Sequence, residues 1–447
     1  MKIVILLLAI FTGTILGAET TWKAGAAKTV ITPKEPMWMA GYAGRTKPAE
    51  GTAQELYAKA LALEDGHGKR FVFVTLDLIG VPRALRASLE KRLAAAQALP
   101  PEALLLNVSH THCGPEYRVA NEPGIFAEFG HAEQAAAYGA FLEEALFKLV
   151  NDAIAQLAPA QLSYHHARCG FAMNRRLPVE NTFRNAPNPD GPVDHNVPVL
   201  RVTDPAGKLR AVMFGYACHN TTLPFYQWCG DYAGYAQEYL EAEHPEAVAL
   251  FVEGCGGDQN PYPRGRIELA QFHGRALATS VEAALTTPPV PITGALRSAF
   301  GDVTLDFATP PDRAELEART KASDKYIVSH ARKLLDRLDK GETLPTSYPY
   351  PVQVVRLGDS LTFVGLSGEV VVDYSLRLHR EIGGGPLWIA GYCNDVMAYI
   401  PSRRVLEEGG YEGGDSMRFS NLPGPWAPTI EERVVGQVHA LLKSTAP

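Results

Sequence analysis

Three segments of this 447-residue chain repeat one local pattern, in which two apolar runs flank a short polar turn that contains glycine. The segments span residues 57–78, 198–220 and 352–369. Apolar runs joined by such a turn are typical of β-hairpins. Hairpins favour layered antiparallel or mixed sheets over a sheet made of parallel strands alone.

Helical patterns alternate with the hairpins. Residues 132–156 carry apolar side chains at helical spacing, residues 265–285 predict a second helix, and the charged segment 311–339 predicts one long surface helix. Two stretches, 177–194 and 407–428, are predicted as long loops, which in compact domains are often functional. The predicted fold class is a mixed α/β (α+β) architecture, with layered sheets built from hairpins and flanked by helices.

The composition is that of an ordinary globular protein, with 46% hydrophobic and 20% charged residues. The length leaves room for one large domain or two ordinary ones. A net charge of −7 argues against a nucleic-acid partner, which would require a basic face. The six cysteines show no C-x-x-C spacing, so we expect buried packing residues or one or two disulfides rather than thiolate metal ligands.

Residues 1–18 have the pattern of a secretory signal peptide: one lysine, an apolar run and then small residues. The apolar run is short for a membrane anchor, and we expect no transmembrane segment after it. The expected location is therefore secreted or periplasmic.

The first candidate site is a His-x-His pair, His110 and His112, at the end of the apolar strand ALLLNVSH. Residues two apart in a strand face the same side, so both imidazoles could point into one pocket. The pair is as consistent with exposed or hydrogen-bonded loop histidines as with a metal or catalytic site.

Two further candidates each follow the second strand of a predicted hairpin: His219 and Glu369. Polar residues after His219 could fix its tautomer. Two histidines and one glutamate match the three protein ligands of hydrolytic zinc sites, which keep one position open. A structural histidine and a solvated carboxylate are the alternatives.

Two other segments carry weaker signals. Residues 249–265 combine a strand with a glycine-rich turn, which is either a tight turn or a set of backbone amides that bind an oxyanion. Arg175 and Arg176 lie in FAMNRRLP and are either solvated charges or groups that bind a carboxylate or oxyanion.

Taken in order, these motifs resemble the neutral (non-lysosomal, alkaline) ceramidase family. SHTHCGP matches a T-H-T-H-x-G-P-like run with Ser109 in place of a threonine, and the spacing of two tyrosines also agrees. The other matching runs are KAGAAKTVITP, MAGYAG, YACHNTTL, LSGEV and YEGG.

The resemblance implies a zinc ion held by four residues: His110, His219, Glu369 and Tyr399. It implies that three others contact the amide and its oxyanion: His112, Arg175 and Tyr411. The implied reaction is hydrolysis, by zinc-activated water, of the amide of an N-acyl lipid such as ceramide to a sphingoid base and a fatty acid. The implied partner is a lipid-like amide, met at a membrane surface.

The chain departs from the family at two points. The G-D-x-S-P-N run, whose serine is important for catalysis, is GDQNPY here, with Asn260 at the serine position. Asparagine cannot act as a nucleophile, although its amide could donate a hydrogen bond to an oxyanion, so a zinc-hydroxide mechanism would survive and a serine acyl-enzyme would not. We also expect residues 19–447 to form one catalytic domain without the family's immunoglobulin-like C-terminal domain.

Two other functions fit the same residues. One is a zinc esterase or amidase that acts on a small non-lipid substrate. The other is a secreted binding protein that has lost turnover. Asn260 in place of the family's serine favours this function, whereas the retention of all four proposed zinc ligands argues against it.

Overall fold

The computed structural model describes residues 22–119 and 132–446, and the predicted signal peptide at 1–18 lies outside this part of the chain. Its layers are helices, a large sheet, a smaller sheet, and helices again. The predicted mixed α/β class, with layered sheets flanked by helices, is confirmed.

The large sheet has nine strands in the order β12-β10-β9-β6-β1-β3-β4-β5, with β14 paired to β6. Its strands are β1 (Trp22–Val30), β3 (Tyr57–Glu64), β4 (Arg70–Leu76), β5 (Leu104–Val108), β6 (Ala158–Arg168), β9 (Asn196–Thr203), β10 (Leu209–Tyr216), β12 (Val248–Glu253) and β14 (Val290–Ile292). The predicted hairpins at 57–78 and 198–220 are β3–β4 and β9–β10. Parallel pairing occurs at β4–β5 and β10–β12.

The smaller sheet has the order β15-β16-β17-β19. Its strands are β15 (Arg297–Asp306), β16 (Ser347–Leu357), β17 (Leu361–Leu366) and β19 (Leu387–Ala390). The third predicted hairpin, at 352–369, is β16–β17. Three short sheets complete the fold: β2 (Gly51–Thr52) with β11 (Gln227–Trp228), β7 (Ala172–Val179) with β8 (Thr182–Asn188) and β13 (Gln259–Pro261), and β18 (Glu369–Val370) with β20 (Tyr399–Ile400).

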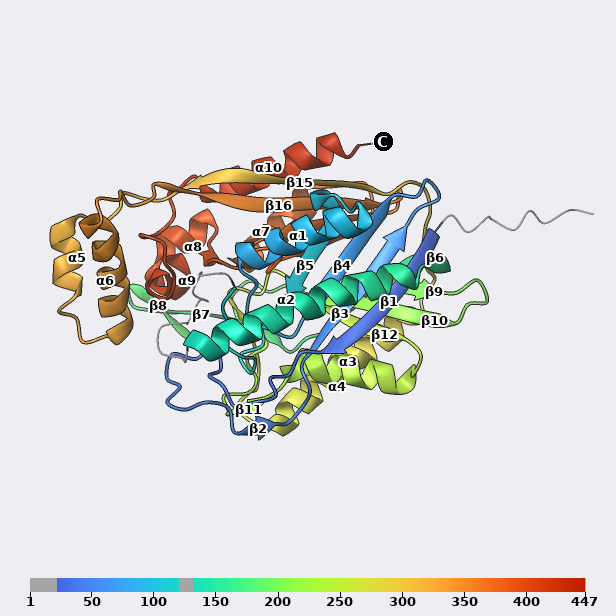
Figure 1. Ribbon diagram of the computed structural model, residues 1–447, viewed down its shortest axis with the longest axis horizontal. Coiled ribbons are helices and arrows are strands. Elements are labelled where there is room, and N and C mark those ends of the chain that lie inside the picture. The colour runs from blue at the N-terminus through green and yellow to red at the C-terminus, as the bar shows by residue number, and fades with distance from the viewer. Residues whose placement is uncertain (1–21, 120–131, 447) are drawn as a thin grey trace, which may run out of the picture.

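Helices cover the outer faces of the two main sheets. Those on the large sheet are α1 (Arg83–Gln97), α2 (Ala132–Ala155), α3 (Asp231–Glu243) and α4 (Ile267–Leu285), and those on the smaller sheet are α7 (Val372–Glu381) and α10 (Ile430–Ser444). Figure 1 shows α10 lying along β15 and β16, and α5 (Arg313–Arg319) with α6 (Lys325–Asp339) at one end of the molecule. The remaining short helices are η1 (Pro101–Ala103), α8 (Arg403–Glu408), α9 (Gly410–Gly413) and η2 (Asp415–Phe419).

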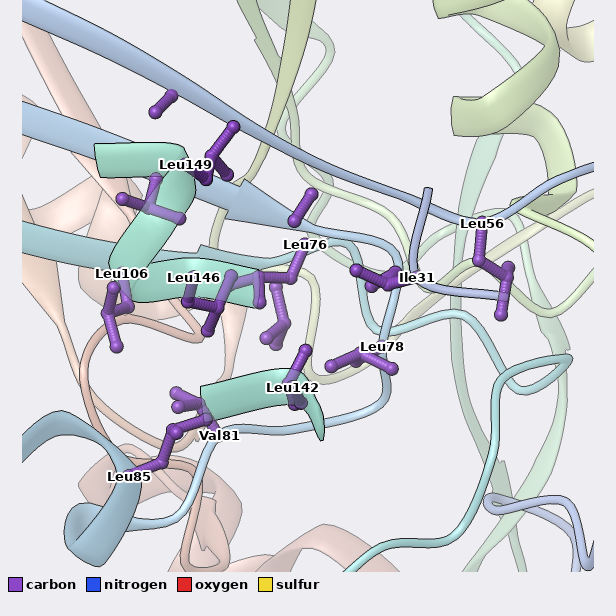
Figure 2. Packing of buried hydrophobic residues seen from close by; sticks show 14 of the residues in the cluster. Ile31, Leu56, Leu76, Leu78, Val81, Leu85, Leu106, Leu142, Leu146 and Leu149 are labelled. Carbon is purple, nitrogen blue, oxygen red and sulfur yellow. The ribbon is translucent and has the colours of Figure 1, made fainter. Parts of the chain in front are cut away.

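The large sheet is buried on both faces, which explains why its strands read as nearly continuous apolar runs. In β3, Leu61 and Leu63 face the smaller sheet, whereas the alternating alanines belong to the core beneath α2. The predicted stripe of α2 lies in that core, and Figure 2 shows Leu142, Leu146 and Leu149 among its packed side chains. A rigid double-sheet body therefore carries the loops that follow its strands.

Two sequence predictions about these connections are wrong. Residues 177–194 contain the β7–β8 hairpin rather than only a long loop. Residues 311–339 form two helices, because Asp324 caps α6 by accepting a hydrogen bond from the Tyr326 amide. The segment 407–428 carries α9 and η2 between irregular stretches.

All six cysteines lie in the described ranges, where each is a buried free thiol. This agrees with the expected packing role and not with the disulfide alternative. Among the helices of residues 22–119 and 132–446, none is both long and apolar enough to span a bilayer.

Candidate active site

The predicted site residues come together where strands of both sheets end. His110 and His112 follow β5, and His219 follows β10. Glu369 opens β18 and Tyr399 opens β20, and the parallel register of these two strands pairs the residues directly. The fold thus gathers side chains that are up to 289 positions apart in the sequence.

Buried hydrogen bonds between β5 and β12 fix the distance between the loop that carries His110 and the turn that carries His219. The Asn107 side chain accepts a hydrogen bond from the Glu253 amide (2.8 Å) and donates one to its carbonyl (3.3 Å). The Glu253 carboxylate in turn accepts from the Cys218 amide (2.9 Å) and from Asn220 Nδ2 (3.2 Å). These contacts hold both sides of the turn that carries His219.

Backbone carbonyls fix the tautomers of two histidines. His110 Nδ1 lies 2.6 Å from the Ile79 carbonyl and His219 Nδ1 lies 2.7 Å from the Gly256 carbonyl. A carbonyl can only accept, so each Nδ1 carries the proton and each Nε2 keeps its lone pair. In metal sites, backbone carbonyls that accept from the other ring nitrogen orient the binding histidines in the same way.

The free Nε2 atoms of His110 and His219 lie 3.1 Å and 3.3 Å from Glu369 Oε2. The Tyr399 hydroxyl lies 3.1 Å from His219 Nε2. Glu369 Oε2 is sealed from solvent and, within the described residues, receives no hydrogen bond. Lone pairs from two nitrogens and one carboxylate oxygen therefore converge without a proton between them, an arrangement that a cation would stabilise.

The charge states suit a cation. Burial, together with the nearby Arg175 charge, lowers the pKa of His219 to about 3. Burial also holds the pKa of His112 well below its usual value. Neutral imidazoles are the protonation state in which histidines ligate metals.

His112 lies beside His110, His219 and Glu369, but the predicted strand alternation does not place it there. The strand ends at Val108, and His110 has a left-handed φ of 58°, so strand alternation does not orient the pair. The His112 ring instead packs at 4.7 Å on Tyr42, with Nε2 3.2 Å from His110 Nε2. Ligand atoms of His110, His112 and His219 lie within 4.8 Å of one another, so these three histidines could hold a metal ion.

Gly41, from the MAGYAG run, makes room for the His112 ring. A Cβ at this position would lie 2.4 Å from His112 Cγ, and the backbone φ is +98°. Only glycine fits both the space and the conformation.

Arg175 is buried in β7, so the prediction of a solvated charge in a loop is wrong for this residue. It donates to the Tyr399 hydroxyl (2.8 Å), Glu412 Oε1 (2.8 Å) and Asn260 Oδ1 (3.2 Å). Arg176 bonds the other Glu412 oxygen at 2.7 Å. The guanidinium of Arg175 is therefore held in place against the proposed ligand Tyr399.

The remaining predicted residues also lie here. The Tyr411 ring packs 5.3 Å from that of Tyr399. Asn260 directs its carbonyl oxygen at Arg175 and at the Thr221 hydroxyl (3.2 Å). The side-chain oxygen of Asn260 thus serves as an acceptor that positions Arg175.

The glycine-rich turn after β12 does not form an oxyanion hole. The amides of Gly254, Gly256 and Gly257 donate to the carbonyls of Tyr216, Gly254 and Val370. A Cβ on Gly257 would meet the Glu369 carbonyl oxygen at 2.7 Å. The turn instead allows close backbone packing behind the site.

Sequence reasoning missed Tyr392. Its buried ring lies 4.6 Å from the His110 ring, and its hydroxyl lies 3.4 Å from His219 Nδ1. Tyr392 lies two residues past the end of β19, so a search for polar side chains after every predicted strand, and not only after hairpins, would have included it.

An apolar cavity of 480 Å³ adjoins the site. Ile79, whose carbonyl binds His110, lines it, and so does Phe419, whose ring lies 6.2 Å from that of Tyr411. Other apolar lining residues are Val81, Met397 and Leu422. The volume falls within the range of small-molecule binding sites.

Helix-flanked sheets with a buried histidine, glutamate and tyrosine cluster at their strand ends define a mixed α/β protein with a candidate metal site. Comparison with protein families identifies it further: residues 22–271 match the family described as neutral/alkaline non-lysosomal ceramidase, N-terminal. The chain belongs to this family of hydrolases.

Solved structures share the fold. The neutral ceramidase from Pseudomonas aeruginosa superposes with a TM-score of 0.74 at 20% identity, over 96% of this chain and 75% of that one. A structure described as ceramidase complexed with C2 gives a TM-score of 0.70 at 20% identity, over 94% of this chain and 76% of that one. A search of curated proteins found no match.

Proposed function

We propose that this protein is a zinc-dependent amidohydrolase that cleaves the amide of an N-acyl lipid such as ceramide into a sphingoid base and a fatty acid. The observation that carries the proposal is the convergence of His110 Nε2, His219 Nε2 and Glu369 Oε2, with the Tyr399 hydroxyl 3.1 Å from His219 Nε2. Nitrogen and oxygen donors of this kind suit zinc. When bound, zinc supplies a Lewis acid for the amide carbonyl and lowers the pKa of a water molecule.

The chain's own residues would perform the other tasks. Burial raises the pKa of Tyr399, and the Arg175 guanidinium, 2.8 Å from its hydroxyl, opposes that shift and so would help the phenolate form to bind a metal. His112 presents Nε2 to the site, where a proton on this atom can be donated to the oxyanion of the tetrahedral intermediate. Tyr411 offers a second hydroxyl beside Tyr399. The reaction ends when the C–N bond breaks and the amine nitrogen takes a proton.

The adjoining cavity supports a lipid substrate. Its apolar side chains can shelter a hydrocarbon chain while the amide lies at the histidine cluster. Membership of the ceramidase family favours the same substrate class. We also propose, from the signal-like sequence at 1–18, that the protein is secreted or periplasmic.

The test measures metal content and release of fatty acid from ceramide on one purified sample, before and after chelation and after zinc is restored. About one zinc per chain, with hydrolysis that disappears on chelation and returns with zinc, would support the proposal. Zinc without ceramide turnover would favour an amidase or esterase with a smaller substrate. A protein that takes up no zinc would contradict the metal assignment and favour a binding protein.

A further inference from the structure

Two carboxyl groups of the described residues line the apolar cavity, those of Glu116 and Asp395, and the proposed chemistry uses neither. Glu116 lines the cavity and is only 6% exposed. Its Oε1 is sealed from solvent and has no hydrogen-bond partner within the described residues. The backbone at this point is fixed, because the Glu116 amide donates to the Trp38 carbonyl at 2.8 Å and Pro115 bridges to Met39.

Other charged groups around the cavity are already paired. Arg83 Nε lies 3.2 Å from Asp395 Oδ2, and the Tyr348 hydroxyl donates to the same oxygen at 2.7 Å. Arg337 bonds Glu342 at 3.1 Å. Glu116 differs from these groups because its Oε1 atom is buried without a hydrogen-bond partner among the described residues.

Burying a carboxyl oxygen without a hydrogen-bond partner costs folding free energy. Burial raises the pKa of Glu116 to about 7, although the Arg118 charge opposes the shift. Near neutral pH this group can therefore be present as an acid or as a carboxylate. A hydroxyl group can hydrogen bond to either form, whereas a buried ammonium would need the carboxylate and a larger desolvation cost.

We propose that Glu116 is a specificity-determining residue that binds a hydroxyl group on the hydrophobic chain of the substrate. The proposal rests on the proposed function, since it assigns the apolar cavity to a lipid chain. It narrows the substrate class to N-acyl amides with a chain hydroxyl inside the cavity. A plain hydrocarbon chain would leave the carboxyl buried without a partner.

The experiment compares N-acyl sphingoid amides that differ by a single hydroxyl, in one pair on the acyl chain and in another on the sphingoid chain. The ratio of kcat/KM within each pair is measured for the wild type, Glu116→Gln and Glu116→Leu. For one pair we expect a wild-type preference of about tenfold for the hydroxylated member. Glu116→Leu should abolish this preference and Glu116→Gln should retain part of it.

Leu422→Ala is the matched control, because it removes apolar surface from the same cavity and should weaken both members of a pair by similar factors. Thermal unfolding checks that each variant folds, and Glu116→Gln keeps the test valid should the leucine variant fail. Equal kcat/KM values within both wild-type pairs, or a preference that survives in Glu116→Leu, would overturn the proposal.

Binding of the matching free fatty acids and sphingoid bases, with and without the hydroxyl, is measured by calorimetry. This readout needs no turnover. A Glu116-dependent binding preference without hydrolysis of any amide would overturn the proposed reaction and keep the subsite. Equal binding of all ligands would overturn the subsite whether or not amides are cleaved.

Discussion

Gly41 offers a sharp test of how His112 takes part in the reaction. In Gly41→Ala, the new Cβ would lie 2.4 Å from His112 Cγ and 2.5 Å from Nδ1. Carbon atoms in ordinary contact are separated by ~3.5 Å or more, so the imidazole must move by about 1 Å. A misplacement of about 1 Å at a reacting group can lower the rate by roughly 100-fold.

The assay is kcat/KM on ceramide, measured together with zinc content and unfolding free energy. We expect a loss of about 10- to 100-fold in kcat/KM, unchanged zinc content, and a destabilisation of about 1–2 kcal/mol from the positive φ. Gly44→Ala is the matched control in the same loop, because its Cβ would meet no atom within 4 Å.

Either of two results would refute this reasoning. Wild-type kcat/KM in Gly41→Ala would show that the position of His112 does not matter for the reaction. Loss of zinc in Gly41→Ala, with zinc retained in Gly44→Ala, would show that His112 is itself a ligand.

Three further predictions follow from the site. Glu369→Gln should lower zinc affinity by more than about tenfold and abolish hydrolysis, and metal analysis that finds full zinc occupancy would contradict the ligand set. Asn260→Ala should cost about 1–3 kcal/mol in urea unfolding, because a buried N–H of Arg175 loses its acceptor; unchanged stability and rate would show that the contact is unimportant. The pKa of Glu116 rises from 4.5 to about 7 on folding, so the folded state loses stability as pH increases across this interval. Glu116→Gln should therefore gain about 3 kcal/mol relative to the wild type between pH 4.5 and 8 in urea unfolding, and a difference that does not vary with pH would contradict the shift.

The site residues that follow predicted strands, His219 and Glu369, could be found from the sequence because a strand end is marked by a local pattern. An apolar run followed by a polar turn and a second apolar run shows where a hairpin ends, and His219 and Glu369 lie just past such ends. The resemblance to a family then added Tyr399, which physical reasoning alone does not select as a zinc ligand.

The remaining contacts depend on residues far apart in the chain, which no local pattern encodes. From the sequence alone, Arg175 is as consistent with a solvated charge as with a binding group. Its partner Glu412 lies 237 positions later in the chain, and only the fold brings the two side chains into contact. The orientation of His112 depends on the small size of Gly41, and the buried surroundings of Glu116 depend on the cavity. Such features require the assembled fold.

The most direct test of the central claim is a crystal structure of the zinc-loaded protein with anomalous diffraction data on both sides of the zinc absorption edge. The account predicts one strong zinc peak about 2 Å from each of four atoms: His110 Nε2, His219 Nε2, a Glu369 carboxylate oxygen and the Tyr399 phenol oxygen. No peak among these atoms, or a peak held by His112 in place of Tyr399, would contradict it.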